Sequence, residues 1–249
     1  MKINRLLMTA IFSFVGVLAV AQSWMMQPQG PVNEFSAMEG TSVLNYNFQV
    51  ERNIHSRAGN GPVFYIFPDC KLDNNQALEL AGNLDLVNII KEYGGRIMVV
   101  NPSSDKWQEQ DLEDFRRLIG MGSSPTNVKV IGIGSGATFV NRQLVATELA
   151  GVIAGIVSID GEPGKICRLP VPAFIGGKNA AKAAKPYQTT SDSAPADPLQ
   201  KVVVNTDKKA SLETLFAEAW DKVLSANYRY NNLYRTFYTS RGIDNPEGV

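Results

Sequence analysis

The sequence predicts a three-layer α/β protein, in which helices cover both faces of a mostly parallel sheet. Short, continuous apolar runs typical of buried strands alternate with segments that carry apolar residues at helical spacing. Near the N-terminus, residues 43–51 alternate apolar and polar side chains with a period of two, which predicts an antiparallel strand with one solvated face. A further apolar run, 128–133, stops at a cluster of glycines just before a helical segment, and α/β proteins place their ligands at such turns.

The other elements follow in chain order. Strands are predicted at 62–67, 96–101, 128–133, 154–160, 169–177 and 201–206, and helices at 77–93, 111–120, 139–149 and 212–224. Because strands separated by helices form parallel sheets, their carboxyl ends should share one edge, where ligands bind. The residues expected at that edge are Asp69, Asn101, Gly132 to Gly136, Asp160, Gly176 and Asn205.

The N-terminal 21 residues are typical of a secretory signal peptide. Lys2 and Arg5 precede an apolar run at 6–20, and Ala19 to Ala21 provide a small-residue cleavage site. The apolar run is shorter than the roughly 20 residues that span a bilayer, so we expect no membrane span and a periplasmic or extracellular protein. Residues 22–42 should form an extended lead-in, and 43–249 one domain, with an irregular excursion at 180–200 and an aromatic C-terminal flap at 225–249.

Composition excludes several classes of function. Lys plus Arg and Asp plus Glu balance at 24 each, so no overall field draws the protein to nucleic acid or to an anionic membrane. One histidine and two cysteines do not supply a clustered zinc-ligand set, and we expect neither a metal nor a cofactor. In an oxidising compartment Cys70 and Cys167 are candidates for a disulfide, with two separate buried thiols as the alternative.

The glycine turn fits two functional frames and one structural frame. In a nucleophile elbow, Gly132 and Gly136 are the two small positions and the apex is Gly134, which has no nucleophile. In a dinucleotide-binding turn, Gly132, Gly134 and Ala137 form the glycine fingerprint. A tight turn without a ligand is the third interpretation. Ser135 follows the apex and is expected to cap the helix, because as a nucleophile it would lack a positioned base.

From about Val43 to Leu224 the chain resembles the α/β-hydrolases, specifically the exported esterases that include polyhydroxybutyrate depolymerases and feruloyl esterases. The resemblance lies in the elbow frame 132–137, the strand ending at 158–161, the segment 171–178 and the pair Pro186-Tyr187. It implies a three-layer α/β sandwich and a catalytic set in the order nucleophile, acid, histidine.

Matched residue by residue, that catalytic set is missing. The nucleophile position is Gly134, and the acid segment 178–185 holds no carboxylate. No histidine follows Lys201, while the single histidine, His55, precedes the core and is interpreted as a polar turn residue. We therefore expect a pseudo-hydrolase that acts as a binding or accessory protein. An esterase or depolymerase with an atypical catalytic set is the alternative, and a Rossmann-type nucleotide-binding protein is a third.

Ligand-binding candidates lie in two regions. Asp69 and Asp160 end two strands and could form a glycosidase-like pair if close, or serve as acceptors in loops. Near the C-terminus Trp220, Tyr228, Arg229 and Tyr230 combine aromatic faces with a guanidinium group, which suits a sugar or an aromatic ester, although the rings could instead pack on the core. The expected partner is a carbohydrate, an ester-containing ligand or a protein.

Overall fold

The structure is a computed structural model that describes residues 33–38, 41–48, 62–93, 95–121, 128–192 and 201–225. Within these ranges eight strands form one sheet in the order β1-β2-β4-β3-β5-β6-β7-β8. They are β1 (Asn33–Met38), β2 (Thr41–Phe48), β3 (Val63–Phe67), β4 (Gly95–Val100), β5 (Val128–Ile133), β6 (Ile153–Ile159), β7 (Ala173–Gly176) and β8 (Val202–Asn205). Strands β3 to β8 pair in parallel, whereas β2 runs antiparallel to β4. The predicted sheet, with its antiparallel N-terminal strand, is confirmed.

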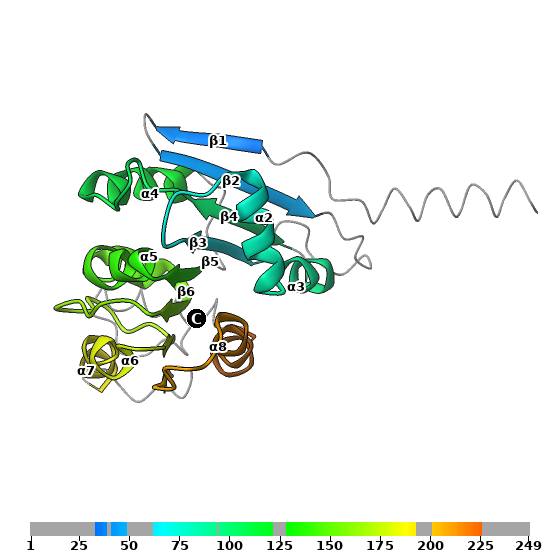
Figure 1. Cartoon of the computed structure of the whole chain (residues 1–249). Coiled ribbons are helices and arrows are strands. Elements are labelled where there is room, and N and C mark those ends of the chain that lie inside the picture. The colour runs from blue at the N-terminus through cyan, green and yellow to red at the C-terminus, as the bar shows by residue number, and fades with distance from the viewer. Residues whose placement is uncertain are drawn as a thin grey trace, which may run out of the picture.

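Helices cover both faces of this sheet (Figure 1). The described helices are α2 (Asn74–Asn83), α3 (Leu86–Tyr93), α4 (Glu109–Met121), α5 (Ser135–Phe139), α6 (Ala180–Ala183), α7 (Lys185–Asp192) and α8 (Leu212–Ala219), with short π or 3₁₀ turns η1 (Val140–Leu144), η2 (Glu148–Val152) and η3 (Trp220–Leu224). Each face buries a separate apolar cluster. Val130 joins Phe115 and Phe139 beneath α4 and α5, whereas the next residue of β5, Ile131, packs with Phe64 and Phe216 on the α2 and α8 side.

The helix predicted at 77–93 is two helices. Asp73 caps α2, since its side chain accepts from the N–H groups of Asn75 and Gln76, and Gln76 completes a capping box. The chain then turns at Leu84 and Asp85, where Asp85 has a φ of 54°. Apolar periodicity continues across this turn because both helices bury one side against the same face, which explains why the pattern alone did not reveal the break.

Two segments have more regular structure than predicted. Residues 33–38, within the extended lead-in, pair as the edge strand β1, whose Phe35 lies opposite Val43 of β2. The excursion predicted at 180–200 is helical over α6 and α7, which bury Ala183, Ala184 and Tyr187. Small residues gave these helices little periodic signal, and tertiary burial decided their conformation. Residues 193–200 lie outside the described ranges.

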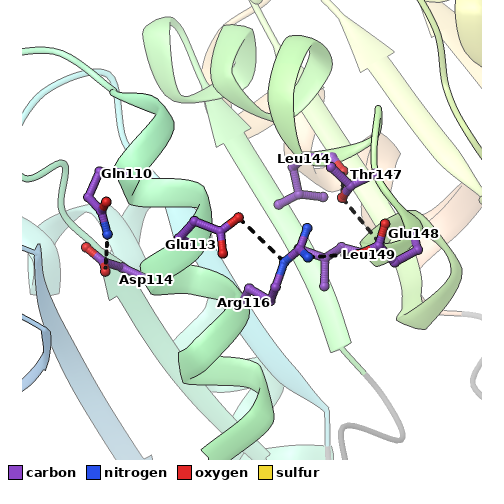
Figure 2. Close-up of polar contacts among 8 residues, drawn as sticks. All are labelled: Gln110, Glu113, Asp114, Arg116, Leu144, Thr147, Glu148 and Leu149. Atoms are coloured by element: carbon purple, nitrogen blue, oxygen red, sulfur yellow. Dashed lines mark hydrogen bonds and ion pairs between the residues drawn. The ribbon is translucent and has the colours of Figure 1, made fainter.

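Polar contacts anchor α4 to its neighbours. The Thr41 hydroxyl, buried at the start of β2, lies 2.9 Å from Asp114 Oδ2 and 3.2 Å from Asp111 Oδ1. Arg116 reaches from α4 toward η2, with Nη1 3.0 Å from Glu148 Oε1 (Figure 2). Both partners of this ion pair are partly exposed, so it contributes less than about 1 kcal/mol and mainly fixes orientation.

Candidate functional site

The glycine turn between β5 and α5 is a strained strand-to-helix turn. Gly134 is its apex, with φ 56° and ψ −117°, a conformation that L side chains rarely adopt. Its N–H donates to Ile159 O at 2.9 Å, which ties the turn to the end of the neighbouring strand β6. Ser135 then begins α5. This is the local geometry of a nucleophile elbow, with glycine where the nucleophile would be.

The flanking glycines allow the turn to pass close to its neighbours. A Cβ atom on Gly132 would lie 2.6 Å from Ala137 Cα, and one on Gly136 would lie 2.5 Å from the carbonyl carbon of Phe67. Both distances are shorter than real Cβ contacts, and both involve backbone atoms that cannot rotate away. The two positions therefore require glycine for packing alone, whatever the turn does chemically.

Asp69, just after β3, occupies the space in front of the apex. A Cβ atom on Gly134 would lie 2.5 Å from Asp69 Cγ. Asp69 Oδ1 accepts a hydrogen bond from Ser135 N at 2.6 Å, and the Ser135 hydroxyl donates to the main-chain oxygen of Asp69. The Asp69 carboxylate thus fills the volume that a nucleophile side chain at position 134 would need.

The same contact occupies a backbone donor of catalytic importance. In a nucleophile elbow, the N–H of the residue after the nucleophile is one of the two oxyanion-hole donors. Here that residue is Ser135, whose N–H is already bound to the Asp69 carboxylate. The expectation that the Ser135 side chain caps α5 was wrong: α5 has Gly134 at its N-cap and no side-chain cap, and the hydroxyl bridges to Asp69 instead.

The catalytic acid and histidine of a hydrolase would follow β7 and β8, and other residues occupy both places. After β7 the chain continues through Lys178 and Asn179 into α6, without a carboxylate. After β8, Asn205 accepts from the N–H of Asp207, and Asp207 accepts from the N–H of Lys209, which closes two tight turns. No histidine lies among the described residues, and His55 falls outside them.

The carboxylates of Asp160 and Asp69 accept hydrogen bonds from different backbone donors. Asp160 ends β6 with a φ of 58°, and its Oδ1 accepts from the N–H of Lys178 at 2.8 Å. Its carboxylate packs against Gly177, where a Cβ atom would lie 2.8 Å from Asp160 Cγ. Each aspartate therefore accepts a backbone hydrogen bond from a different turn, Asp69 from Ser135 and Asp160 from Lys178.

The disulfide considered for Cys70 and Cys167 is not formed, since both cysteines are free. Cys70 is exposed beside Asp69, whereas Cys167 is buried and its thiol donates to Leu169 O at 3.2 Å. Burial raises the pKa of the Cys167 thiol to about 12. The separate-thiol alternative describes Cys167, but Cys70 is not buried.

The predicted aromatic cluster is only partly described. Trp220 begins η3 and lies 6.3 Å from Phe64, measured between ring centroids, on the α2 and α8 side of the sheet. It therefore contacts the core. Tyr228, Arg229 and Tyr230 lie outside the described residues, so their role in ligand binding stays a prediction.

Two cavities open near the carboxyl ends of β3 and β4. The smaller, of about 230 Å³, adjoins the elbow and is lined by Asp69, Cys70, Leu72, Glu79, Leu80 and Ile133. The larger, of about 460 Å³, is more polar and includes Ser42, Lys71, Asp73, Asn74 and Asn101. Strand-end reasoning found Asp69 and Asn101. It missed the α2 residues, although Gln76, Glu79, Leu80 and Asn83 recur at helical spacing and all line the smaller cavity.

A buried polar network lies beneath the turn, and sequence reasoning missed it. Tyr187, fully enclosed in α7, donates to Asn141 Oδ1 at 2.8 Å, and Asn141 Nδ2 donates to Glu162 O at 2.9 Å. Burial raises the pKa of the Tyr187 hydroxyl well above its usual value. The pair Pro186-Tyr187 was the one signal in the sequence. The network joins η1, the loop after β6 and α7 behind the elbow.

Two further surveys cover the described part of the chain. It contains no group of three or more His, Cys, Asp or Glu side chains arranged to hold a metal ion. None of its helices is both long enough and apolar enough to cross a membrane.

Comparisons with known proteins identify the fold. No protein-family model matches the chain, and no curated protein matches its sequence. An α/β-hydrolase enzyme from a Medee basin deep-sea metagenome library matches in structure with a TM-score of 0.52 and 14% identity, over 88% of this chain and 98% of that one. A bacterial heroin esterase matches with a TM-score of 0.51 and 12% identity, over 87% and 90% of the two chains.

These likenesses, with the strand order and the turn after β5, define an α/β-hydrolase fold. The Rossmann interpretation was wrong, because that fold places its glycine turn after the first strand of the sheet, whereas this turn follows β5. The turn therefore lies at the elbow of a hydrolase architecture. Fold alone does not carry activity.

Proposed function

We propose that this chain is an exported, non-catalytic member of the α/β-hydrolase architecture, a pseudo-hydrolase that serves as a binding or accessory protein. The observation that carries the proposal is the Asp69 carboxylate, which lies against Gly134 and accepts the N–H of Ser135. A carbonyl substrate would need both the nucleophile volume and this donor.

The chemistry around Ser135 supports the same conclusion. A serine hydroxyl attacks an ester only when a positioned base takes its proton. The Ser135 hydroxyl donates to a main-chain carbonyl of Asp69, which cannot act as that base. The usual positions of acid and histidine hold Lys178, Asn179 and the turn at Asn205 to Lys209.

The proposed ligand is a carbohydrate or an ester-containing molecule, with a protein partner as the other class. The cavity beside the elbow combines an apolar wall, Leu72, Leu80 and Ile133, with the Glu79 carboxylate. Its volume of about 230 Å³ lies below the roughly 300 to 1,000 Å³ of drug-sized ligand sites, so it suits one small group rather than a whole polymer.

Hydrolysis of p-nitrophenyl acetate and butyrate tests the proposal. We expect the purified protein to match a heat-denatured sample and Ser135→Ala to change nothing. Turnover that Ser135→Ala abolishes would instead establish the alternative, an esterase with an atypical catalytic set. Turnover that survives Ser135→Ala but is lost in Asp69→Ala would point to Asp69 as the reactive group and would also contradict the proposal.

A further inference from the structure

The loop that follows β6, residues 161–168, begins at the carboxyl edge of the sheet and runs back along η1. The Glu162 N–H donates to Thr138 Oγ1 at 2.9 Å, and the Arg168 N–H donates to Val145 O at 2.7 Å. Between these points a Cβ atom on Gly164 would lie 2.8 Å from the Asn141 carbonyl carbon, so the backbone rests directly on η1. The loop is therefore pinned at both ends and in the middle.

One apolar side chain, Ile166, is exposed on this loop. Ile166 is 55% exposed, the higher of the two large exposed apolar side chains among the described residues. Its neighbour Cys167 points inward and is buried. A single exposed apolar side chain is ordinary on a protein surface. This one lies on a loop whose backbone is hydrogen-bonded on both sides of it, at Glu162 and Arg168.

Five exposed cations lie in this loop or on the segments hydrogen-bonded to it. Lys165 and Arg168 flank it in the loop, and Arg142 of η1 donates its Nε to Pro163 O at 3.3 Å, which places it beneath the loop. The backbone N–H of Lys178 donates to Asp160 Oδ1, and the side chain of its neighbour Asn179 donates to Glu162 Oε1. Lys182 follows on α6. These residues, Arg142, Lys165, Arg168, Lys178 and Lys182 with Ile166, form the surface we name the basic loop face.

The charges of the basic loop face are not neutralised internally. All five cations are exposed, and none forms an ion pair within the described residues. Two acids lie nearby, Asp160 and Glu162, which accept hydrogen bonds from Lys178 N and Asn179 Nδ2, so five cations face two carboxylates. The overall charge balance of 24 against 24 therefore conceals a local excess of positive charge.

We propose that the basic loop face docks on an anionic phospholipid surface. In Figure 1 the loop lies between α5 and α6 and reaches out past them, so it presents a projecting edge rather than a groove. A lipid surface accepts such an edge because it deforms around an inserted apolar side chain while its headgroups pair with the surrounding cations. This interaction is peripheral and separate from the elbow, so it does not depend on the proposed function.

Sedimentation of the full-length protein with vesicles tests the proposal. The readout is the binding to phosphatidylglycerol-containing vesicles minus the binding to pure phosphatidylcholine vesicles, which removes charge-independent binding. Comparison between variants cancels the contribution of the N-terminal segment, which all of them share. We expect the double variant Lys165→Glu/Arg168→Glu to weaken the anionic-specific binding by about 25-fold or more, since each surface cation contributes roughly fivefold. Ile166→Ser should weaken it by about fivefold to tenfold through lost apolar burial.

The matched control is Lys106→Glu/Arg117→Glu. It makes the same change in net charge at two exposed cations outside the basic loop face, and we expect it to leave binding within about twofold. Far-UV circular dichroism and thermal unfolding establish that every variant folds. Equal loss in the control and loop variants, or no excess on anionic vesicles, would overturn the proposal. The proposal would also be overturned if the protein bound polyglutamate as tightly as vesicles and Ile166→Ser left that binding unchanged. Such a result would indicate an acidic protein partner.

Discussion

The carboxylate of Asp69 and the missing side chain of Gly134 occupy one space, since a Cβ atom on Gly134 would lie 2.5 Å from Asp69 Cγ. The two residues are 65 positions apart and end neighbouring parallel strands, β3 and β5. Each constrains the other: an acid can fold over the turn because position 134 lacks a side chain, and position 134 cannot regain one while the acid remains.

Gly134→Ser should therefore destabilise the fold by roughly 2 to 4 kcal/mol. Overpacking costs about 1 to 3 kcal/mol, and a side chain at φ 56° adds backbone strain of similar size. Urea unfolding monitored by circular dichroism measures the change. Gly82→Ser is the control, because nothing lies within 4 Å of a Cβ atom there and the change should stay within about 1 kcal/mol.

The double variant Asp69→Ala/Gly134→Ser should be more stable than the sum of the single changes predicts. Removing the carboxylate relieves the overlap, so a double-mutant cycle should give a favourable coupling of about 1 to 2 kcal/mol. We expect this variant to remain inactive on p-nitrophenyl esters, since acid and histidine are still missing. Additive free energies of unfolding would mean that the Asp69 side chain simply swings away.

Lys129→Met should stabilise the protein at neutral pH. Lys129 lies on β5 opposite Phe64 and Gly155 and is 3% exposed, and its Nζ has no hydrogen-bond partner within the described ranges. Burial lowers its pKa from 10.5 to about 8. The shift corresponds to a penalty on the order of 3 kcal/mol for the charged form, so the expected gain at pH 7 is about 1 to 3 kcal/mol.

The pH dependence of the free energy of unfolding tests the same prediction independently. The unfolded lysine binds its proton up to a higher pH than the folded one, so the free energy of unfolding of the wild type should rise from pH 8 to 10.5 relative to Lys129→Met. Lys209→Met, at an exposed turn, is the control for the loss of a surface ammonium group. A constant gap between wild type and Lys129→Met across this range would contradict the burial of the ammonium group.

The two thiols should differ sharply in reactivity. With a thiol-reactive disulfide reagent at pH 8, the exposed Cys70 should react within minutes in the native protein, while Cys167 should react only on unfolding because its pKa lies near 12 and its side chain is buried. Cys70→Ser should remove the fast phase alone. Absence of reactive thiols in the denatured, unreduced protein would reveal the disulfide that the structure lacks.

Tyr187→Phe should cost about 1 to 3 kcal/mol of stability, because it leaves Asn141 Oδ1 buried without its donor. Tyr65→Phe is the matched control: Tyr65 is also buried, but among the described residues its hydroxyl has no hydrogen-bond partner, so we expect a change within about 0.5 kcal/mol. Equal losses in chemical denaturation would assign the effect to ring packing rather than to the hydrogen bond.

The sequence by itself determined the layered α/β architecture, the antiparallel β2 and the glycines at 132, 134 and 136. These follow from local rules, since strand and helix periodicity are written along the chain and a tight turn needs residues without side chains. It also located Asp69 at a strand end. It did not reveal the break at Leu84 and Asp85, the edge strand β1 or the helices α6 and α7, where burial against distant elements outweighs weak local preference.

Only the tertiary structure decided what the turn contains. That the Asp69 carboxylate lies over Gly134 and binds Ser135 N depends on β3 and β5 being sheet neighbours, a long-range relationship that neither segment encodes alone. The same holds for Asn141 and Tyr187, and for the five cations of the basic loop face, which lie on four separate segments. Physical contact between residues far apart in the chain is set by packing, so sequence could place candidates at one edge but could not say which of them meet.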